Sequence, residues 1–309
     1  MNINNLQKII RKGRILKDEP MSAHTTFRAG GPAAYYFIPA DENEAAGLIR
    51  YFHNNSIPYF VMGNGSNLLV SDEGFEGAVI DLGKNDGTSF TMLGIDDERE
   101  DGILFDCGAG CLLSAIGSYA LKFSATGFEA LGGIPGCVGG ACIMNAGAFG
   151  SEIKDVISEA RVITKTGELR TLHRDEMSFG YRTSSLLEEG YTVARASFLL
   201  KKGDPAEIEA RMKELTARGK EKQPLEYPSA GSTFKRPEGD FAGRLIEEAG
   251  LRGYRHGGAM VSEKHCGFII NYDHASARDI YELMEEVRKK VFEHSGVMLE
   301  PEVKMLGRF

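Results

Sequence analysis

The chain has 309 residues, and its 36 Lys and Arg against 44 Asp and Glu give a formal net charge of -8. This length exceeds a single compact core and predicts two or three domains, and the acidic balance argues against nucleic-acid binding through a basic patch. The first twenty residues lack the apolar segment of a signal peptide, and no run approaches the length that crosses a bilayer. We therefore expect a cytoplasmic protein without membrane insertion.

Glycine and cysteine usage narrows the class of protein further. The 38 glycines cluster at a few places between apolar runs, which is typical of tight turns or of main chain that closely approaches a ligand. The cysteine count is five, and no CxxC pair occurs. The sequence therefore predicts neither a disulfide framework nor a metal site.

The first eighty residues predict two helices and several short strands. Residues 2–12 carry apolar side chains at helical spacing, and a β-rich run predicts a strand over Tyr35–Ile38. Asp41 followed by Glu44 resembles a capping box, and the apolar stripe behind it predicts a helix of about three turns. Residues 59–82 then read as short strands separated by glycine turns.

The middle of the chain alternates between strand and helix patterns. A strand is predicted over 102–107, a helix over 111–122, a hairpin over 156–173 around Thr166 and Gly167, and a strand over 191–201. The composition shifts to charged residues near Lys201–Asp204. We therefore expect a domain boundary at about residue 203.

The last third of the chain predicts three helices. They cover residues 205–222, 240–249 and 276–294, and the last has a sustained apolar stripe. Gly296 follows this stripe as a predicted helix stop.

Three glycine-rich segments have the composition of anion-binding turns. They cover Gly63–Asn67, Gly108–Gly110 and Gly132–Gly140. Successive glycines let main-chain N–H groups converge on phosphate oxygens, although each segment alone is equally typical of a tight turn. None completes the GxGxxG dinucleotide fingerprint or the P-loop pattern ending in GK[ST]. The segments predict a phosphate-bearing ligand without a Rossmann or P-loop fold.

Six segments along the chain, in order, resemble the UDP-N-acetylenolpyruvoylglucosamine reductase (MurB) family. They read GNGSNLLVSD, GFEALGGIPGCVGGACIMNAGAFG, YRTSSL, YPSAGSTFKRPEGDFAGRLIEEAGL, VSEKHCGFIIN and LEPEVKMLG. The resemblance implies an α+β chain with the vanillyl-alcohol-oxidase (PCMH-type) FAD-binding fold and a C-terminal α+β substrate-binding domain. It implies FAD-binding subdomains at 1–80 and 81–203 and the substrate domain at 204–309.

The resemblance also implies which residues bind non-covalent FAD. They are Arg28, Gly63, Asn64, Gly65, Ser66, Asn67, Gly133, Ile134, Pro135, Gly136, Gly139, Gly140, Asn145, Ala146 and Gly147. One type of the family carries an extra loop with a tyrosine that covers the substrate. Tyr181 and Arg182 are followed within ten residues by the strand that starts at Tyr191, so the chain resembles the shorter type without this tyrosine.

The family's reaction uses NADPH and FAD to reduce UDP-N-acetylglucosamine enolpyruvate to UDP-N-acetylmuramate. Three residues match the family's catalytic positions: Arg182 for the substrate carboxylate, Ser232 as proton donor, and Glu302 as the carboxylic acid. Taken alone, Arg182 is more typical of a surface salt bridge, and Ser232 is more typical of a turn. Glu302 is preferred over Glu300 because it directly precedes the Val-Lys pair of the motif.

Further residues are assigned to the substrate by their place in the motifs. Lys235 and Arg236 are candidates for the diphosphate, although a solvated charged turn is equally compatible, and Tyr227 is a candidate for the pocket lining. His265 is more typical of a structural histidine, and we assign it no catalytic role.

Two other functions remain open at this stage. A sugar or lactone oxidase of the same fold often binds flavin covalently through histidine, but none of the seven histidines lies in Gly63–Asp72, where the fold would place it. A non-catalytic flavin-binding regulator is the second alternative. The presence of all three reacting residues argues against it.

Overall fold

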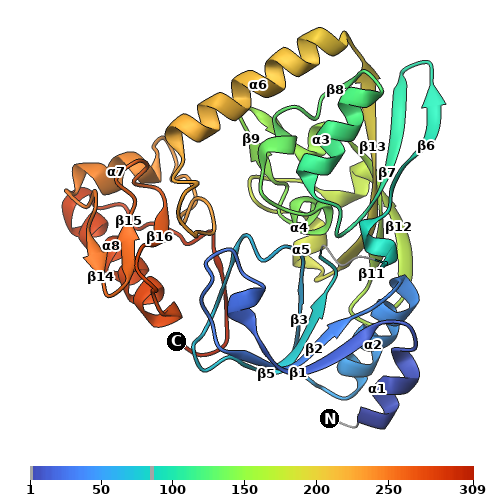
Figure 1. Ribbon diagram of the computed structural model, residues 1–309, viewed down its shortest axis with the longest axis horizontal. Helices are drawn as coiled ribbons and strands as arrows, with labels where there is room; N and C mark the ends of the chain where they lie inside the picture. Colours follow the sequence, from blue (N-terminus) through green and yellow to red (C-terminus); the bar gives the residue numbers. More distant parts are fainter. Residues whose placement is uncertain (1–2, 84–86) are drawn as a thin grey trace. The chain divides into compact units, whose positions relative to one another are not determined.

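A computed structural model describes residues 3–83 and 87–309, so residue 2 of the first predicted helix lies outside the described part (Figure 1). The described chain forms two compact units, each built from separate stretches of sequence. Unit 1 comprises 1–16, 35–64 and 77–217, and unit 2 comprises 17–34, 65–76 and 218–309. The three-domain division expected from the sequence stays a prediction.

A four-stranded sheet has the order β1–β2–β5–β3, with bounds Arg14–Pro20, Pro32–Ile38, Phe75–Asp81 and Tyr59–Met62. In unit 1 the helices α1 (Ile3–Ile9) and α2 (Glu42–Asn54) accompany it. The apolar stripe of α2 is buried against side chains of β2 and β5. The members of this core that the stripe and the strands contribute are Ala45, Leu48, Ile49, Phe52, Phe37, Ala78 and Ile80.

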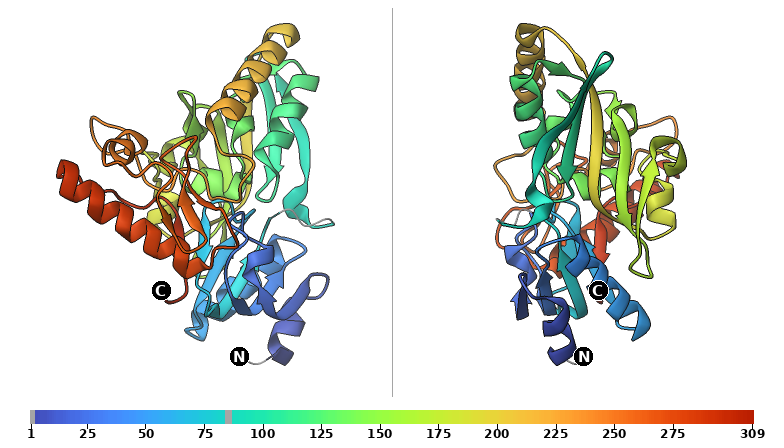
Figure 2. Two further views of the ribbon diagram at one scale, coloured as in Figure 1. Left: turned by 60° about the vertical axis from the view of Figure 1, so that its left-hand side comes forward. Right: turned by 90° about the vertical axis from the view of Figure 1, so that its right-hand side faces the viewer.

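The second sheet of unit 1 is antiparallel and has the order β12–β11–β13–β7–β6. Its strands are Leu169–His173, Ile157–Ile163, Thr192–Lys202, Gly102–Gly108 and Leu93–Arg99, and β8 (Ala125–Thr126) pairs with β13. Figure 2 shows these strands side by side, with β13 as the long yellow strand. The helix α3 (Leu113–Lys122) packs against the sheet through Leu113 and Ile116, which share a core with Phe105.

Unit 1 also contains several short elements, and α6 continues from it into unit 2. The helices are α4 (Val138–Ile143), α5 (Ser185–Glu188) and α6 (Pro205–Lys222), and β9 (Gly147–Ala148) pairs with β10 (Ser151–Glu152). Single 3₁₀ turns of unit 1 lie at Ser89–Thr91, Leu131–Gly133, Ile153–Asp155 and Arg174–Met177, and one of unit 2 lies at Met21–Ala23.

Unit 2 contains two small sheets and two helices. In one sheet, β4 (Leu68–Val70) pairs in parallel with β17 (Lys304–Leu306). The other is antiparallel, with β15 (Ala259–Val261) between β14 (Arg255–His256) and β16 (Ile269–Asn271). The helix α8 (Ala277–Ser295) packs on this sheet, and the shorter α7 (Ala242–Glu248) packs on α8. The apolar stripe of α8 forms the core through Ile280, Leu283, Met284, Val287 and Val291.

Both ends of α8 are closed by side chains or by glycine. Ser276 accepts from the N–H of Asp279, and the carboxylate of Asp72 accepts from the N–H groups of Ala277 and Arg278, each at 2.9 Å. Gly296 adopts the left-handed conformation, with φ of 73°, at the other end. The predicted stop at Gly296 is confirmed, whereas Asp72 is a cap from 205 residues away that no local pattern indicates.

The helices and the hairpin that the sequence predicted lie within a few residues of their observed bounds, whereas β1, β6, α4 and β14–β16 were not predicted. The helix expected over 111–122 is Leu113–Lys122, that over 240–249 is Ala242–Glu248, and that over 276–294 is Ala277–Ser295. The hairpin over 156–173 is confirmed as β11 and β12, with Gly167 at φ of 78° in its turn. No helix in residues 3–83 and 87–309 has the length and apolar character needed to cross a membrane.

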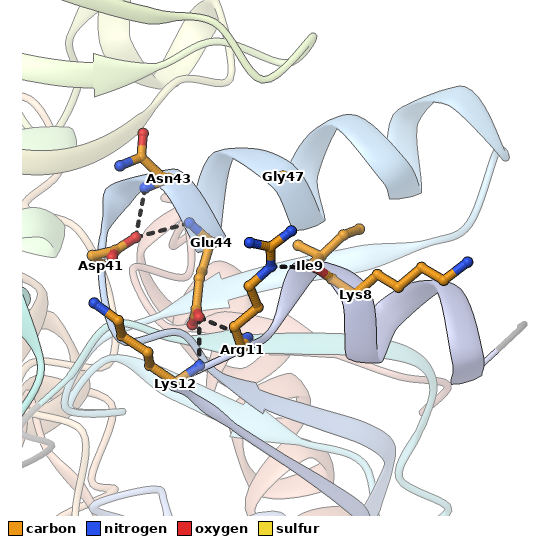
Figure 3. Close-up of a pocket in the computed structure, with 8 residues that line it drawn as sticks. All are labelled: Lys8, Ile9, Arg11, Lys12, Asp41, Asn43, Glu44 and Gly47. Atoms are coloured by element: carbon orange, nitrogen blue, oxygen red, sulfur yellow. Dashed lines mark hydrogen bonds between the residues drawn. The ribbon is translucent and has the colours of Figure 1, made fainter.

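Asp41 caps α2 as the spacing predicted, because its Oδ1 accepts from the N–H of Glu44 at 3.0 Å, whereas the carboxylate of Glu44 has a different role. This carboxylate accepts from the main-chain N–H groups of Arg11 and Lys12 at 2.8 Å (Figure 3). It also accepts from the N–H groups of Ala40 at 2.9 Å and Gly13 at 3.1 Å. Burial by itself raises the pKa of this carboxyl group, but the four donors outweigh it, so the pKa lies below the usual 4.5. Glu44 thus holds the segment after α1 against the start of α2.

The substitution Glu44→Gln tests this clamp. It replaces one acceptor oxygen by an amide group that faces N–H donors, so we expect unit 1 to lose about 2 kcal/mol of unfolding free energy at pH 7. The depressed pKa means that this stabilisation is present above about pH 4.5 and is lost as pH falls through the folded-state pKa. Thermal unfolding should show the gap to wild type closing in acid, and the exposed Glu209→Gln should show no gap at any pH.

Candidate active site

In unit 2, the segment that carries Ser232 pairs with the segment that carries Glu302. The N–H of Glu302 donates to the carbonyl of Thr233 at 2.8 Å, and the N–H of Lys235 donates to the carbonyl of Glu300 at 2.9 Å. Phe234 lies opposite Pro301 in an antiparallel bridge. Two predicted site residues that are 70 positions apart in sequence are therefore on adjacent, hydrogen-bonded main chain.

Thr233 fixes the main chain beside Ser232. Its side chain is fully buried, its Oγ1 accepts from the N–H of Ile269 at 2.9 Å, and its own N–H donates to the carbonyl of Gly267 at 2.9 Å. Ser232 itself is exposed. Sequence reasoning missed Thr233. Its place between the motif residue Ser232 and the apolar Phe234 was the only feature of the sequence that indicated a structural role.

The second half of the Gly63–Asn67 segment lies in the same unit as Glu302. The side-chain Nδ2 of Asn67 donates to the carbonyl of Glu302 at 3.2 Å, and the N–H of Lys304 donates to the carbonyl of Asn67 at 3.0 Å. Gly65 has φ of 61°, and a Cβ there would lie 2.0 Å from the carbonyl oxygen of His24, so only glycine fits.

The three predicted substrate residues all have neighbours within unit 2. The ammonium group of Lys235 is paired with the carboxylate of Glu300, and the guanidinium of Arg236 lies 4.5 Å from the ring centroid of Phe241. The half-buried ring of Tyr227 is 5.4 Å from the ring of Tyr272, centroid to centroid. The Lys235 pair is solvent-accessible, and such pairs are weak enough to exchange for a bound anion.

Tyr272 extends this aromatic contact. The guanidinium of Arg255 lies 4.2 Å from the ring centroid of Tyr272. No local sequence pattern links residues 227, 255 and 272, so sequence reasoning did not find them together.

Arg182 belongs to unit 1, where it contacts a predicted FAD-binding segment. Its guanidinium Nη2 donates to the carbonyl of Gly147 at 3.1 Å. The fully buried Asn145 donates from Nδ2 to the carbonyl of Gly180 at 2.9 Å and accepts at Oδ1 from the N–H of Lys154 at 3.0 Å. The segment Asn145–Gly147 therefore braces both the side chain of Arg182 and the main chain just before it.

The long glycine segment of unit 1 mixes packing with open main chain. Gly139 is packed, because a Cβ there would lie 3.1 Å from the Cβ of Ala109. Gly133 and Gly140 are exposed, and a Cβ at either would meet no protein atom within 4 Å. The open α-carbons of Gly133 and Gly140 fit a ligand that approaches the main chain closely.

Several N–H groups of this segment already have protein acceptors. Those of Gly133, Ile134 and Gly136 donate to carbonyls of the same loop at 3.3, 3.0 and 2.9 Å. A phosphate at this segment would therefore have to share these donors, whereas the α-carbons of Gly133 and Gly140 are open to contact.

Other reactive side chains of the described chain are held in unreactive states. Burial raises the pKa of Cys111 to about 11 and that of Cys142 to about 12, so both stay thiols at neutral pH. Burial lowers the pKa of His265, whose ring packs edge-on against Phe268 and whose Nδ1 accepts from the N–H of Gly267 at 3.1 Å. These environments indicate structural roles.

Comparison with known proteins finds a matching family for each of two parts of the chain. Residues 33–173 match the family described as FAD binding domain, and residues 223–306 match UDP-N-acetylenolpyruvoylglucosamine reductase, C-terminal domain. The predicted fold class, a PCMH-type FAD-binding fold followed by a C-terminal α+β domain, is confirmed.

Similar proteins cover almost the whole chain. A curated UDP-N-acetylenolpyruvoylglucosamine reductase of Lachnoclostridium phytofermentans is 49% identical over 305 residues, which is 99% of this chain and 97% of that protein. One of Agathobacter rectalis is 51% identical over 298 residues, covering 96% and 95%. The crystal structure of the reductase (MurB) from Thermus caldophilus superimposes with a TM-score of 0.79 at 35% identity, covering 96% of this chain and 99% of that one.

The open α-carbon of Gly133 gives a test of the cofactor site. The substitution Gly133→Ala places a methyl group where no protein atom interferes, so the chain should fold with wild-type thermal stability. If FAD lies against this glycine, its affinity should fall about tenfold or more, which corresponds to about 1.4 kcal/mol. Titration of the flavin-free protein with FAD measures this.

Gly219→Ala in α6 is the matched control, since a Cβ there also meets nothing within 4 Å. Unchanged FAD affinity in Gly133→Ala would remove this glycine from the cofactor site.

Proposed function

Because the chain belongs to the UDP-N-acetylenolpyruvoylglucosamine reductase family, we propose that it reduces UDP-N-acetylglucosamine enolpyruvate to UDP-N-acetylmuramate with FAD and NADPH. The observation that carries the proposal is the pairing of the Ser232 and Glu302 segments within a C-terminal part that matches this family. The reaction is a step of peptidoglycan precursor synthesis, and we assign it to the cytoplasm.

FAD would be held by main chain and polar side chains of both glycine segments. The residues proposed for it are Arg28, Gly63–Ser66, Gly133–Gly136, Gly139, Gly140 and Asn145–Gly147. The open α-carbons of Gly133 and Gly140 support this assignment. When bound, the flavin supplies the hydride that adds to the terminal carbon of the enolpyruvyl double bond.

Hydride addition builds negative charge on the α-carbon and on the carboxylate oxygens of the substrate. A guanidinium suits this carboxylate, because it stays charged and offers two parallel donors. Arg182 would take this role, and its bond to the carbonyl of Gly147 limits the positions of its side chain. The family assignment therefore favours a role for Arg182 in binding the substrate carboxylate over the alternative of a surface salt bridge.

Ser232 would supply the proton to the α-carbon. A serine hydroxyl is a weak acid, but a carbanion is basic enough to take its proton when the hydroxyl is positioned beside it. The buried Thr233 keeps the main chain of Ser232 in place, and the side chain of Ser232 stays exposed to a ligand. Glu302, in its protonated form, would donate a hydrogen bond to the substrate carboxylate as charge accumulates there.

The UDP part of the substrate would lie along the rest of the same motif. Lys235 and Arg236 are proposed for the diphosphate, with Lys235 exchanging Glu300 for the phosphate oxygens. Tyr227 would line the pocket with the ring of Tyr272 beside it. We propose no nucleic-acid partner.

Turnover by the wild-type chain is the first test. Continued oxidation of NADPH, beyond the stoichiometric amount that reduces the flavin, should require the enolpyruvyl sugar. The product should be the lactyl ether UDP-N-acetylmuramate, detected by mass spectrometry. Rapid reoxidation of the flavin by O₂ with no response to the sugar would instead identify an oxidase, and absence of both would identify a binding protein.

The variant Ser232→Ala separates the two halves of the reaction. Flavin reduction by NADPH should stay close to the wild-type rate, because Ser232 has no part in it. Reoxidation by the enolpyruvyl sugar should slow by about 10²- to 10⁴-fold, the usual loss when a positioned acid is removed. Stopped-flow absorbance of the flavin follows both steps, with Ser229→Ala as the control in the same segment. Equal rates for Ser232→Ala and wild type in both steps would exclude Ser232 as the proton donor.

A further inference from the structure

The side chain of Asn67 is directed at Glu302, although sequence reasoning assigned it to FAD. Its Nδ2 donates to the main-chain carbonyl of Glu302 at 3.2 Å, and its carbonyl accepts from Lys304 at 3.0 Å. Parallel pairing of β4 with β17 begins at the next residue, where Leu68 lies opposite Lys304. Asn67 therefore attaches the end of the glycine loop to the residue before and the residue after Val303, which is 3% exposed.

The main chain of Glu302 is thereby bonded from two directions. Its carbonyl accepts from Asn67, and its N–H donates to Thr233, the neighbour of Ser232. A residue held at both its N–H and its C=O has little freedom to rotate about its backbone, so the direction of its Cα–Cβ bond is set. The glycine loop, Glu302 and the Ser232 segment thus form one continuous hydrogen-bonded path inside unit 2.

Asparagine is suited to this contact by chemistry and length. An aspartate of the same shape has no donor and would place a negative charge beside the carbonyl oxygen of Glu302. A serine at position 67 has a donor but is shorter, and an alanine leaves the carbonyl without this partner. The amide group of Asn67 is therefore what the contact requires.

We propose that Asn67 is a positioning residue that aligns Glu302 with the substrate and couples the glycine loop to the proton-delivering segment. The inference rests on the proposed function, because it acts through the role assigned to Glu302. It separates Asn67 from its neighbour Ser66, whose side chain keeps the predicted role at the cofactor.

Loss of this alignment should affect one half-reaction only. A displacement of a reacting group by about 1 Å can cost about 100-fold in rate. We expect Asn67→Asp to slow flavin reoxidation by the enolpyruvyl sugar about 10- to 100-fold. Flavin reduction by NADPH and the dissociation constant of FAD should both stay within about twofold of wild type, whereas Ser66→Ala should weaken FAD binding.

A double-mutant cycle with Glu302→Gln tests whether Asn67 acts through Glu302. Wild type, Asn67→Asp, Glu302→Gln and the double variant are compared by single-turnover stopped flow, in which slow reoxidation is still measurable. If Asn67 acts through Glu302, the double variant should be no slower than Glu302→Gln alone. FAD titration of the flavin-free proteins and thermal unfolding accompany the kinetics, and Asn67→Ser replaces Asn67→Asp if the latter does not fold.

Three results would overturn the inference. The rate losses of the two single variants could multiply in the double variant, FAD affinity could fall in Asn67→Asp as in Ser66→Ala, or Asn67→Asp could reoxidise at the wild-type rate. A wild-type chain that the enolpyruvyl sugar does not reoxidise would instead reject the proposed function, and that result is visible before any variant is examined.

Discussion

The hydrogen bond from the N–H of Glu302 to the carbonyl of Thr233 is the contact on which the candidate chemistry of unit 2 depends. It joins segments that are almost 70 residues apart, so the intervening chain has to return to its starting point. The helix α8 makes this return possible, because its apolar stripe is buried in the core and its first N–H groups are bonded to Asp72. The positions of the exposed Ser232 and the partly buried Glu302 thus depend on the capping and packing of α8.

In unit 1, the buried amide of Asn145 holds the main chain near Arg182 by hydrogen bonds. Asn145 has φ of 44° and Arg182 has φ of 55°, conformations that residues other than glycine rarely adopt. Such strain persists only where the surroundings over-determine it, and here the surroundings are the hydrogen bonds that Asn145 makes with Gly180 and Lys154. That a strained backbone coincides with a family catalytic position supports a functional reason for the conformation of Arg182.

The secondary structure could be predicted from the sequence because it depends on local periodicity, as the stripe of α8 and the turn at Gly167 illustrate. The residues of the site could be named because each lies in a motif. The hydrogen-bond partners of these residues could not be predicted, because contacts between distant segments determine them. Asp41 and Glu44 have the spacing of a capping box, yet the carboxylate of Glu44 is taken by N–H groups more than 30 residues away. Asn67 likewise has the composition of a phosphate-binding turn, but its amide bonds to a residue 235 positions later.

The most direct test of this account is a crystal structure of the chain with FAD and the enolpyruvyl sugar bound. The account predicts that the substrate carboxylate lies within hydrogen-bonding distance of the side chain of Glu302, and that the hydroxyl of Ser232 faces the α-carbon. It also predicts that the bonds of Glu302 to Thr233 and to Asn67 persist in the complex. A substrate whose carboxylate lies away from Glu302 and whose α-carbon lies away from the hydroxyl of Ser232 would contradict the central claim, even if the chain turned the substrate over.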